Sequence, residues 1–518
     1  MTRRFRWRGL TALALSVFTA GTLAACTAPS AAQATGATSD TLRVGVVGPT
    51  LVSIDPNTTL RTGSESIVWS VYSRLTSLDN NGQVKPDLAT SWKQASTNSW
   101  TFTLRSGVTY SNGTPLTADT VVWNLQRDID PSNADSPALN WRKQIADVVK
   151  VNDTQVRIDT KTPLLALPKD LATVFFLDPT WAKSHNPATE ALGSGPYELQ
   201  SYTPEQQAVL VRNPSYKGTA PAFAKVIVIG YADEATRLTA LKNHEIDATL
   251  TIDPSNLSSL KGVSGLVVGG ETGQRVQTLQ LNFNRVPFQD IRVRQALNYA
   301  IDRDSITKSI YSGTTSASRT QVISKYYVGY DSGAAVWPYD LDKARQLLAE
   351  AGYANGFTVN VNVPSQTYAG AEQAIQIIKQ EWAQLKVTLN VQVLPSGPWS
   401  DQNLTTDVSK APDIIYWGIQ NPNLDPVQNL LSWTTGYRTN DGALPNQSEY
   451  DNLVSQAATA STNTDLVSDI QQASAWLRNN AALIYLWDQP QTFAYYNTLK
   501  WNPRYDDWFD FVNISKAG

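Results

Sequence analysis

The segment from Val359 to Val393 constrains the fold most strongly. Valines alternate at positions 359, 361 and 363, apolar residues then keep helical spacing from Ala371 to Leu385, and alternation resumes at Val387. Alternation is typical of a strand, and apolar residues three and four positions apart are typical of a helix. This order predicts two parallel strands joined by a right-handed helical crossover. The predicted fold class is therefore α/β, in which ligands bind at the carboxyl ends of strands.

Similar patterns recur along the chain. Apolar runs predict buried strands, and mixed runs predict half-exposed strands. Helices are predicted where an aspartate of N-cap type precedes an apolar stripe, and Gly352 ends the last of them. The buried strands are Leu42–Val47 and Lys225–Tyr231, the half-exposed strands are Thr101–Leu104 and Gln207–Arg212, and the helices begin near Asp233, Asp290 and Asp340.

The first 25 residues have the pattern of a secretory signal, with four arginines before the apolar run Leu10–Phe18 and small residues before Cys26. That run is shorter than the roughly 20 residues of a membrane-spanning helix. The position of Cys26 resembles a bacterial lipobox, in which the cysteine is lipidated and becomes the mature N-terminus. The resemblance predicts a signal peptide at 1–25, a lipid on Cys26 and a flexible spacer at 26–39. An ordinary signal peptide or a single anchor, and the general or the twin-arginine export route, remain alternatives.

Composition narrows the possible functions. Removal of the four arginines leaves 38 of 42 basic residues against 45 acidic ones, a balance that excludes a nucleic-acid partner. The one cysteine allows no disulfide within the chain, and the roughly 480 residues after the spacer predict two or three domains. His185 and His244 lie outside any metal-binding or catalytic spacing. No cofactor, metal ion or catalytic residue is predicted, although a carboxylate pair of a hydrolase has no sequence signature that would exclude it.

Five longer blocks carry a resemblance to a known family. The most specific ones are PDLATSW at Pro86–Trp92 with SWTFTLRSGVTYSNGTPLTADTVVWNL at Ser99–Leu125, and LNFNRVPFQDIRVRQALNYAIDRDSI at Leu281–Ile306. The others are GSGPYEL at Gly193–Leu199 with RNPSYKG at Arg212–Gly218, ALKNHEIDA at Ala240–Ala248, and YDLDKARQLLAEAGY at Tyr339–Tyr353. In this order they resemble the extracytoplasmic solute-binding proteins, family 5, of oligopeptide and dipeptide ABC importers.

The resemblance implies a bilobal periplasmic-binding-protein fold of the two-crossover type, the Venus flytrap, with an extra domain inserted in the first lobe. The first lobe is expected at 40–60, 191–287 and 488–518. The inserted subdomain is expected at 61–190 and the second lobe at 288–487.

The resemblance also implies a function. The expected protein is no enzyme but a monomeric, lipid-anchored receptor outside the cytoplasm, which closes its lobes on a solute and delivers it to a permease with a separate ATPase. The expected solute is an oligopeptide or dipeptide. An oligosaccharide receptor, an exported hydrolase and a ligand sensor are the alternatives.

The ligand-binding residues are also predicted from the resemblance. Peptide-binding relatives carry a loop similar to W-x-A-D-Y-x-D/E-P, whose aspartate pairs with the ligand's α-amino group. Trp417 and Asp425 match the ends of that loop, but Gln420 and Asn421 stand near the aspartate position. Because an amide lacks the opposite charge, both a peptide and a sugar remain open. The predicted contacts are Gly63, Ser64, Glu65, Tyr110, Asn112, Trp399, Trp417, Gly418, Gln420, Asn421, Asp425 and Trp433.

Overall fold

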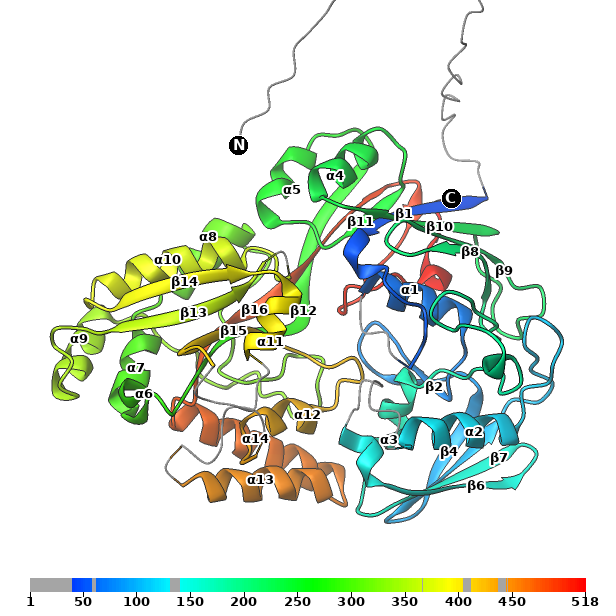
Figure 1. Ribbon diagram of the computed structural model, residues 1–518, viewed down its shortest axis with the longest axis horizontal. Coiled ribbons are helices and arrows are strands. Elements are labelled where there is room, and N and C mark those ends of the chain that lie inside the picture. The colour runs from blue at the N-terminus through cyan, green and yellow to red at the C-terminus, as the bar shows by residue number, and fades with distance from the viewer. Residues whose placement is uncertain are drawn as a thin grey trace, which may run out of the picture. The chain divides into compact units, whose positions relative to one another are not determined.

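Two long strands, β12 (Leu266–Leu281) and β16 (Leu483–Tyr496), run through the middle of the fold (Figure 1). They pair antiparallel, with register shifts between Thr272 and Val276 and between Val276 and Thr278. The computed structural model describes residues 40–57, 62–130, 140–365, 367–403, 411–436, 444 and 446–518. Both strands exceed the usual length of about 5 or 6 residues, so each can join two groups of shorter strands.

The two central strands belong to a ten-stranded sheet of the described chain. On one side of them lie β15 (Ile414–Ile419), β13 (Thr358–Pro364) and β14 (Thr388–Leu394). On the other side lie β11 (Ala248–Leu250), β1 (Thr41–Val47), β10 (Lys225–Tyr231), β9 (Gln207–Arg212) and β8 (Tyr197–Thr203). β1 pairs with β10 and β13 with β14 in parallel.

A second, four-stranded sheet has the order β4 (Ala89–Ser96), β5 (Ser99–Leu104), β7 (Gln155–Thr160) and β6 (Ile145–Asn152). Two small pairs are β2 (Thr76–Leu78) with β3 (Val84–Pro86) and β17 (Leu499–Lys500) with β18 (Ser515–Lys516). The α-helices of the first half are α1 (Thr62–Val71), α2 (Ala118–Ile129), α3 (Leu167–Asp170), α4 (Glu234–Lys242) and α5 (Pro254–Leu260). Those that follow are α6 (Val286–Gln289), α7 (Ile291–Tyr299), α8 (Arg303–Tyr311), α9 (Leu341–Glu350), α10 (Ala371–Ala383), α11 (Ser396–Asn403), α12 (Pro426–Leu430), α13 (Gln447–Thr459) and α14 (Asn463–Asn479).

The strand, helix and strand predicted from Val359 to Val393 are confirmed as β13, α10 and β14, with parallel strands. The three predicted N-caps are confirmed as well. The carboxylates of Asp233, Asp290 and Asp340 accept hydrogen bonds of 2.8 Å from backbone N–H groups at the starts of α4, α7 and α9. These bonds satisfy donors that a helix start otherwise leaves unpaired.

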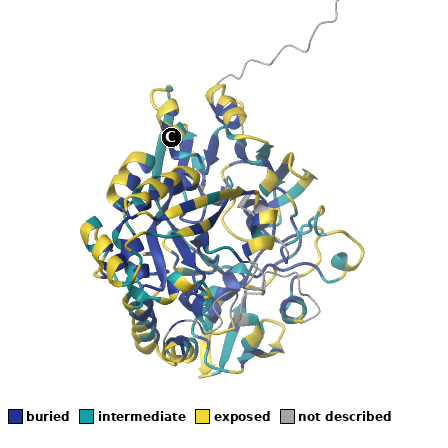
Figure 2. Cartoon of the chain, turned by 60° about the vertical axis from the view of Figure 1, so that its left-hand side comes forward, coloured by how far each residue is buried: buried dark blue, intermediate teal, exposed yellow. Residues whose placement is uncertain are grey.

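Buried side chains form three large clusters. One joins β13, α10, β14, α13, α14 and part of β16, a second joins α1, β1, β10 and the C-terminal segment, and a third lies under the four-stranded sheet with α2. Figure 2 shows the strands of the large sheet mostly in the colour of burial and many surrounding helices with exposed outer faces. The hydrophobic stripes of the helices therefore face the sheets.

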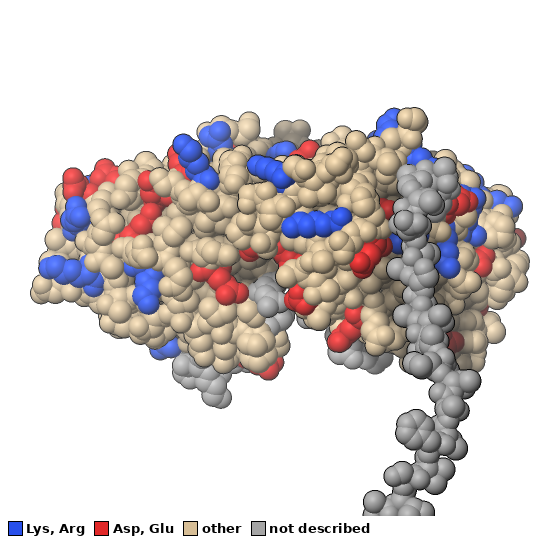
Figure 3. Space-filling view, turned by 90° about the horizontal axis from the view of Figure 1, so that it is seen from above, with Lys and Arg blue, Asp and Glu red and all other residues tan. Residues whose placement is uncertain are grey.

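The predicted signal peptide at 1–25, the lipidation site Cys26 and the spacer at 26–39 lie outside the described residues. The predicted lobe boundaries stay a prediction. Among the described helices, none combines the length and the apolar composition that a membrane crossing requires. On the face that Figure 3 shows, acidic and basic side chains are interspersed, without an extended basic patch of the kind that binds nucleic acid.

Candidate solute-binding cleft

A cavity of about 450 Å³ opens beside the carboxyl end of β1. Its volume falls within the range of roughly 300 to 1,000 Å³ that is typical of small-molecule sites. Its lining residues come from segments far apart in the chain: Gly45, Val46, Val47, Pro49, Thr50, Gly63, Ser66, Arg237, Leu250, Thr251, Arg275, Ser365, Thr367, Pro395, Gln489, Asp507 and Phe509.

The strand ends explain where the cavity lies. Val47 ends β1, Ser365 and Thr367 follow β13, and Pro395 follows β14. Parallel strands place their carboxyl ends at one edge of a sheet, where the connecting loops leave a crevice. The cavity therefore receives backbone from both groups of strands that β12 and β16 join.

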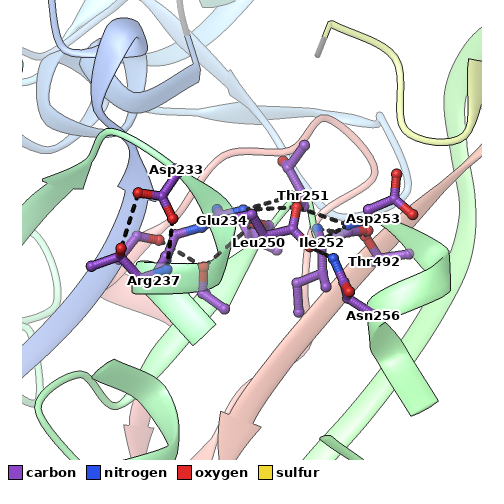
Figure 4. A network of polar contacts seen from close by, with 12 residues as sticks. Asp233, Glu234, Arg237, Leu250, Thr251, Ile252, Asp253, Asn256 and Thr492 are labelled. Carbon is purple, nitrogen blue, oxygen red and sulfur yellow. Dashed lines mark hydrogen bonds and ion pairs between the residues drawn. The ribbon is translucent and has the colours of Figure 1, made fainter. Parts of the chain in front are cut away.

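A buried arginine fixes one wall of the cavity (Figure 4). Arg237 of α4 is 1% exposed, and its guanidinium donates to the carbonyl oxygens of Leu250 at 2.7 Å and Thr251 at 2.9 Å. Glu234 lies 3.6 Å from the same guanidinium and accepts hydrogen bonds from the N–H of Asp253 at 3.0 Å. Thr251 has φ of 55°, a left-handed conformation that these bonds help to hold.

We expect Arg237→Met to lower the free energy of unfolding by about 2 to 4 kcal/mol, because two buried carbonyl groups lose their donor and Glu234 loses its partner. Chemical denaturation followed by circular dichroism measures the loss. Lys242→Met on the exposed side of the same helix is the matched control and should change stability by less than about 0.5 kcal/mol. Equal effects of the two substitutions would contradict the role given to Arg237.

A second cavity of about 230 Å³ adjoins the first and shares Val47, Arg237 and Thr251 with it. Four carboxylates line this second cavity: Asp233, Glu234, Asp253 and Glu372. Glu234 is already paired with Arg237 and with the start of α5. Among the described residues, no group of three or more histidine, cysteine, aspartate or glutamate side chains has the geometry to hold a metal ion.

Two predicted residues lie at or beside the larger cavity. Gly63 lines it at the start of α1, where a Cβ atom would lie 2.5 Å from the hydroxyl oxygen of Thr50. Gly418 in β15 lies beside the Arg275 side chain, since a Cβ at position 418 would come 2.5 Å from Cδ of Arg275. Sequence reasoning missed Arg275, Asp507 and Gln489. The signal for Arg275 was a lone charge in an otherwise uncharged stretch from 272 to 284.

The predicted tryptophans pack against apolar neighbours. Trp399 and Trp417 have ring centroids 5.1 Å apart in a small cluster with Leu394 and Ile415. Trp433 is 1% exposed in the largest core and therefore contributes to packing there. None of the three tryptophans lines the 450 Å³ cavity.

Four other predicted residues of the first half have structural partners or lie away from the cavity lining. Ser64 is buried and donates to the carbonyl of Thr50 at 3.0 Å, and Glu65 is buried in the first turn of α1. Tyr110 is buried under the four-stranded sheet. Asn112 is exposed and its side chain accepts a hydrogen bond of 2.9 Å within its own turn.

The loop after β15 turns its polar side chains inward. Asn421 donates to the carbonyl of Asp425 at 2.8 Å, and Asp425 caps α12 by accepting from Val427 N–H at 3.0 Å. Asn423 of the same loop donates to the carboxylate of Asp170 in α3. Burial raises the pKa values of both Asp170 and Asp425. Half-buried Gln420 does not line the larger cavity, so this loop contributes a buried polar contact with α3.

Comparison with known proteins decides the family. A sequence profile of bacterial extracellular solute-binding proteins, family 5 Middle, matches residues 83–441, which is more than half of the chain. The chain belongs to this family. Heme-binding protein A of Haemophilus influenzae is 27% identical over 446 residues, 80% of this chain and 81% of that protein. The glutathione-binding protein GsiB of Shigella flexneri is 29% identical over 363 residues, 68% of this chain and 70% of that protein.

A solved structure supports the same assignment. The ABC transporter-associated periplasmic binding protein DppA of Helicobacter pylori, in complex with the peptide STSA, superposes with a TM-score of 0.77 at 20% identity. The match covers 92% of this chain and 98% of that one. The predicted family and the α/β binding-protein fold class are thereby confirmed. Family 5 proteins are solute-binding receptors of ABC importers rather than enzymes, and this chain is a receptor of that class.

Proposed function

We propose that this receptor is anchored by a lipid on Cys26, captures a short peptide in the 450 Å³ cavity and delivers it to an ABC permease. The observation that carries the proposal is the cavity itself, built from strand ends of both groups and lined by charges of both signs. Neutral Gln489 and the hydroxyls of Ser365 and Thr367 add hydrogen-bonding groups suited to a peptide backbone. Affinity for a closed arrangement of the two groups would drive closure.

Isothermal titration of the full chain in detergent micelles tests this proposal. The expected result is one-to-one binding of trialanine with no product detectable by mass spectrometry. Binding of maltotriose in place of trialanine would replace the peptide with a sugar, the second candidate kept by the sequence. Formation of a hydrolysis product would overturn the receptor function. Co-purification with a kinase or a permease separates the sensor from the transporter, and size-exclusion chromatography with light scattering tests the proposed monomer.

The lipid anchor gives a separate prediction. We expect wild-type protein expressed in bacteria to partition into the detergent phase of Triton X-114, because an acylated N-terminus adds about 0.8 kcal/mol of membrane affinity per buried methylene. Cys26→Ser should move the protein to the aqueous phase. Thr27→Ser, next in the chain, is the control and should leave partition unchanged. Detergent partition of the Cys26→Ser protein after signal cleavage would contradict the anchor.

A further inference from the structure

The larger cavity holds an arginine whose hydrogen-bonding capacity is largely unused. Arg275 lies on β12, and its Nε atom is buried without a hydrogen-bond partner among the described residues. Its one printed hydrogen bond is long, 3.5 Å from Nη1 to the carbonyl oxygen of Gly418. The guanidinium lies 5.1 Å from the ring centroid of Tyr368. A guanidinium has five N–H donors in a planar fork that suits a carboxylate, so Arg275 has donors to offer a solute.

The absence of a side chain at Gly418 gives Arg275 its space. A Cβ at position 418 would lie 2.5 Å from Cδ of Arg275 and 2.9 Å from the Tyr368 ring. Real Cβ contacts are not that short, so any larger residue would displace the arginine. The strand β15 is therefore built to let this side chain cross it.

An aspartate with no partner lines the same cavity. Asp507 forms no hydrogen bond or ion pair with any residue that the structure describes, Arg275 included. Burial raises the pKa of Asp507 to about 6, while the charge of Arg275 lowers it and that of Asp506 raises it. Its φ of 63° is a left-handed conformation, which is rare outside glycine and concentrates at functional sites. The neighbouring Arg504–Asp506 ion pair is buried and holds this segment in place.

The remaining charge of the cavity is already neutralised. The guanidinium of Arg237 donates to two backbone carbonyl oxygens and pairs with Glu234. Arg275 and Asp507 are thus the opposite charges that are left to meet a solute. A partly buried charge without a partner is costly, and a neutral sugar offers neither of them a counter-charge.

We propose that the cavity selects small zwitterions of the peptide class, with the solute's ammonium group at Asp507 and its carboxylate at Arg275. This assignment rests on the proposed receptor function and replaces the loop Gln420–Asp425 as the element that recognises the solute's charged ends. The two residues lie on separate segments of one cavity, so each should recognise one end independently.

Titration calorimetry with four probes tests the assignment on the full chain in detergent: trialanine, N-acetyl-trialanine, trialanine amide and maltotriose. Wild-type protein should bind each capped peptide about tenfold more weakly than trialanine or worse. Asp507→Asn should abolish the penalty of N-acetylation and keep that of amidation. Arg275→Gln should do the reverse. Asp507→Gly is a second variant, because glycine accommodates a φ of 63° and keeps the fold while removing the carboxylate.

The outcomes separate this assignment from the receptor function. Equal affinity for free and capped peptides, or an equal effect of both substitutions on both penalties, would overturn the zwitterion assignment and leave a peptide receptor. Binding of maltotriose alone would overturn the assignment and leave a receptor for sugars. Binding of no probe by folded wild-type protein would overturn the peptide receptor and the assignment together.

Discussion

Replacing Arg504 with methionine is expected to lower the free energy of unfolding by about 3 to 5 kcal/mol. The Arg504 and Asp506 side chains are 2% and 0% exposed, and Nη2 of the arginine lies 2.6 Å from the carboxylate. The arginine also donates to the carbonyl of Leu78 at 2.9 Å. Its removal leaves a buried carboxylate with no counter-charge, which costs far more than the net value of the pair. Calorimetric unfolding measures the loss.

The chain offers a matched control for this experiment. Arg292 pairs with Asp290 at the same 2.6 Å distance and the same separation in sequence, but the two side chains are 44% and 27% exposed. Arg292→Met should therefore cost about 1 kcal/mol or less. The double variant Arg504→Met with Asp506→Leu should recover much of the stability, because no charge stays buried. A loss after Arg504→Met no larger than that after Arg292→Met would show that burial of the pair does not matter.

Gly418→Ala is expected to weaken trialanine binding by about tenfold or more while changing the free energy of unfolding by less than about 1 kcal/mol. The new methyl group would displace Arg275, whose side chain can move at little cost to the fold. The loss therefore falls on the solute's carboxylate contact. Titration calorimetry measures the affinity, and thermal unfolding measures the stability.

Two further variants make this prediction specific. Gly397→Ala in α11 is the control, since a Cβ at that position would meet nothing within 4 Å. Gly418→Ala should add no further loss in a chain that already carries Arg275→Gln, because both changes remove the same contact. Additive losses in the double variant would mean that Gly418 acts on binding by another route.

The sequence predicts the fold better than the site, for a physical reason. The alternation at 359, 361 and 363 and the N-cap Asp340 act over a few residues, so their patterns are local and readable. Arg275 and Asp507 converge only after β12 and the C-terminal segment have folded, and no local pattern records a contact over 232 positions. The motif ending at Asp425 was readable, but its carboxylate is used to cap α12.

Hydrogen–deuterium exchange with and without saturating trialanine tests the central claim most directly. The account predicts slower exchange in three segments that line the larger cavity, around Val47, around Arg275 and around Asp507. The account also predicts no change around Trp69 and Arg74, which line a separate cavity of about 340 Å³. Protection confined to Trp69 and Arg74 at saturating peptide would contradict a solute site at the strand ends.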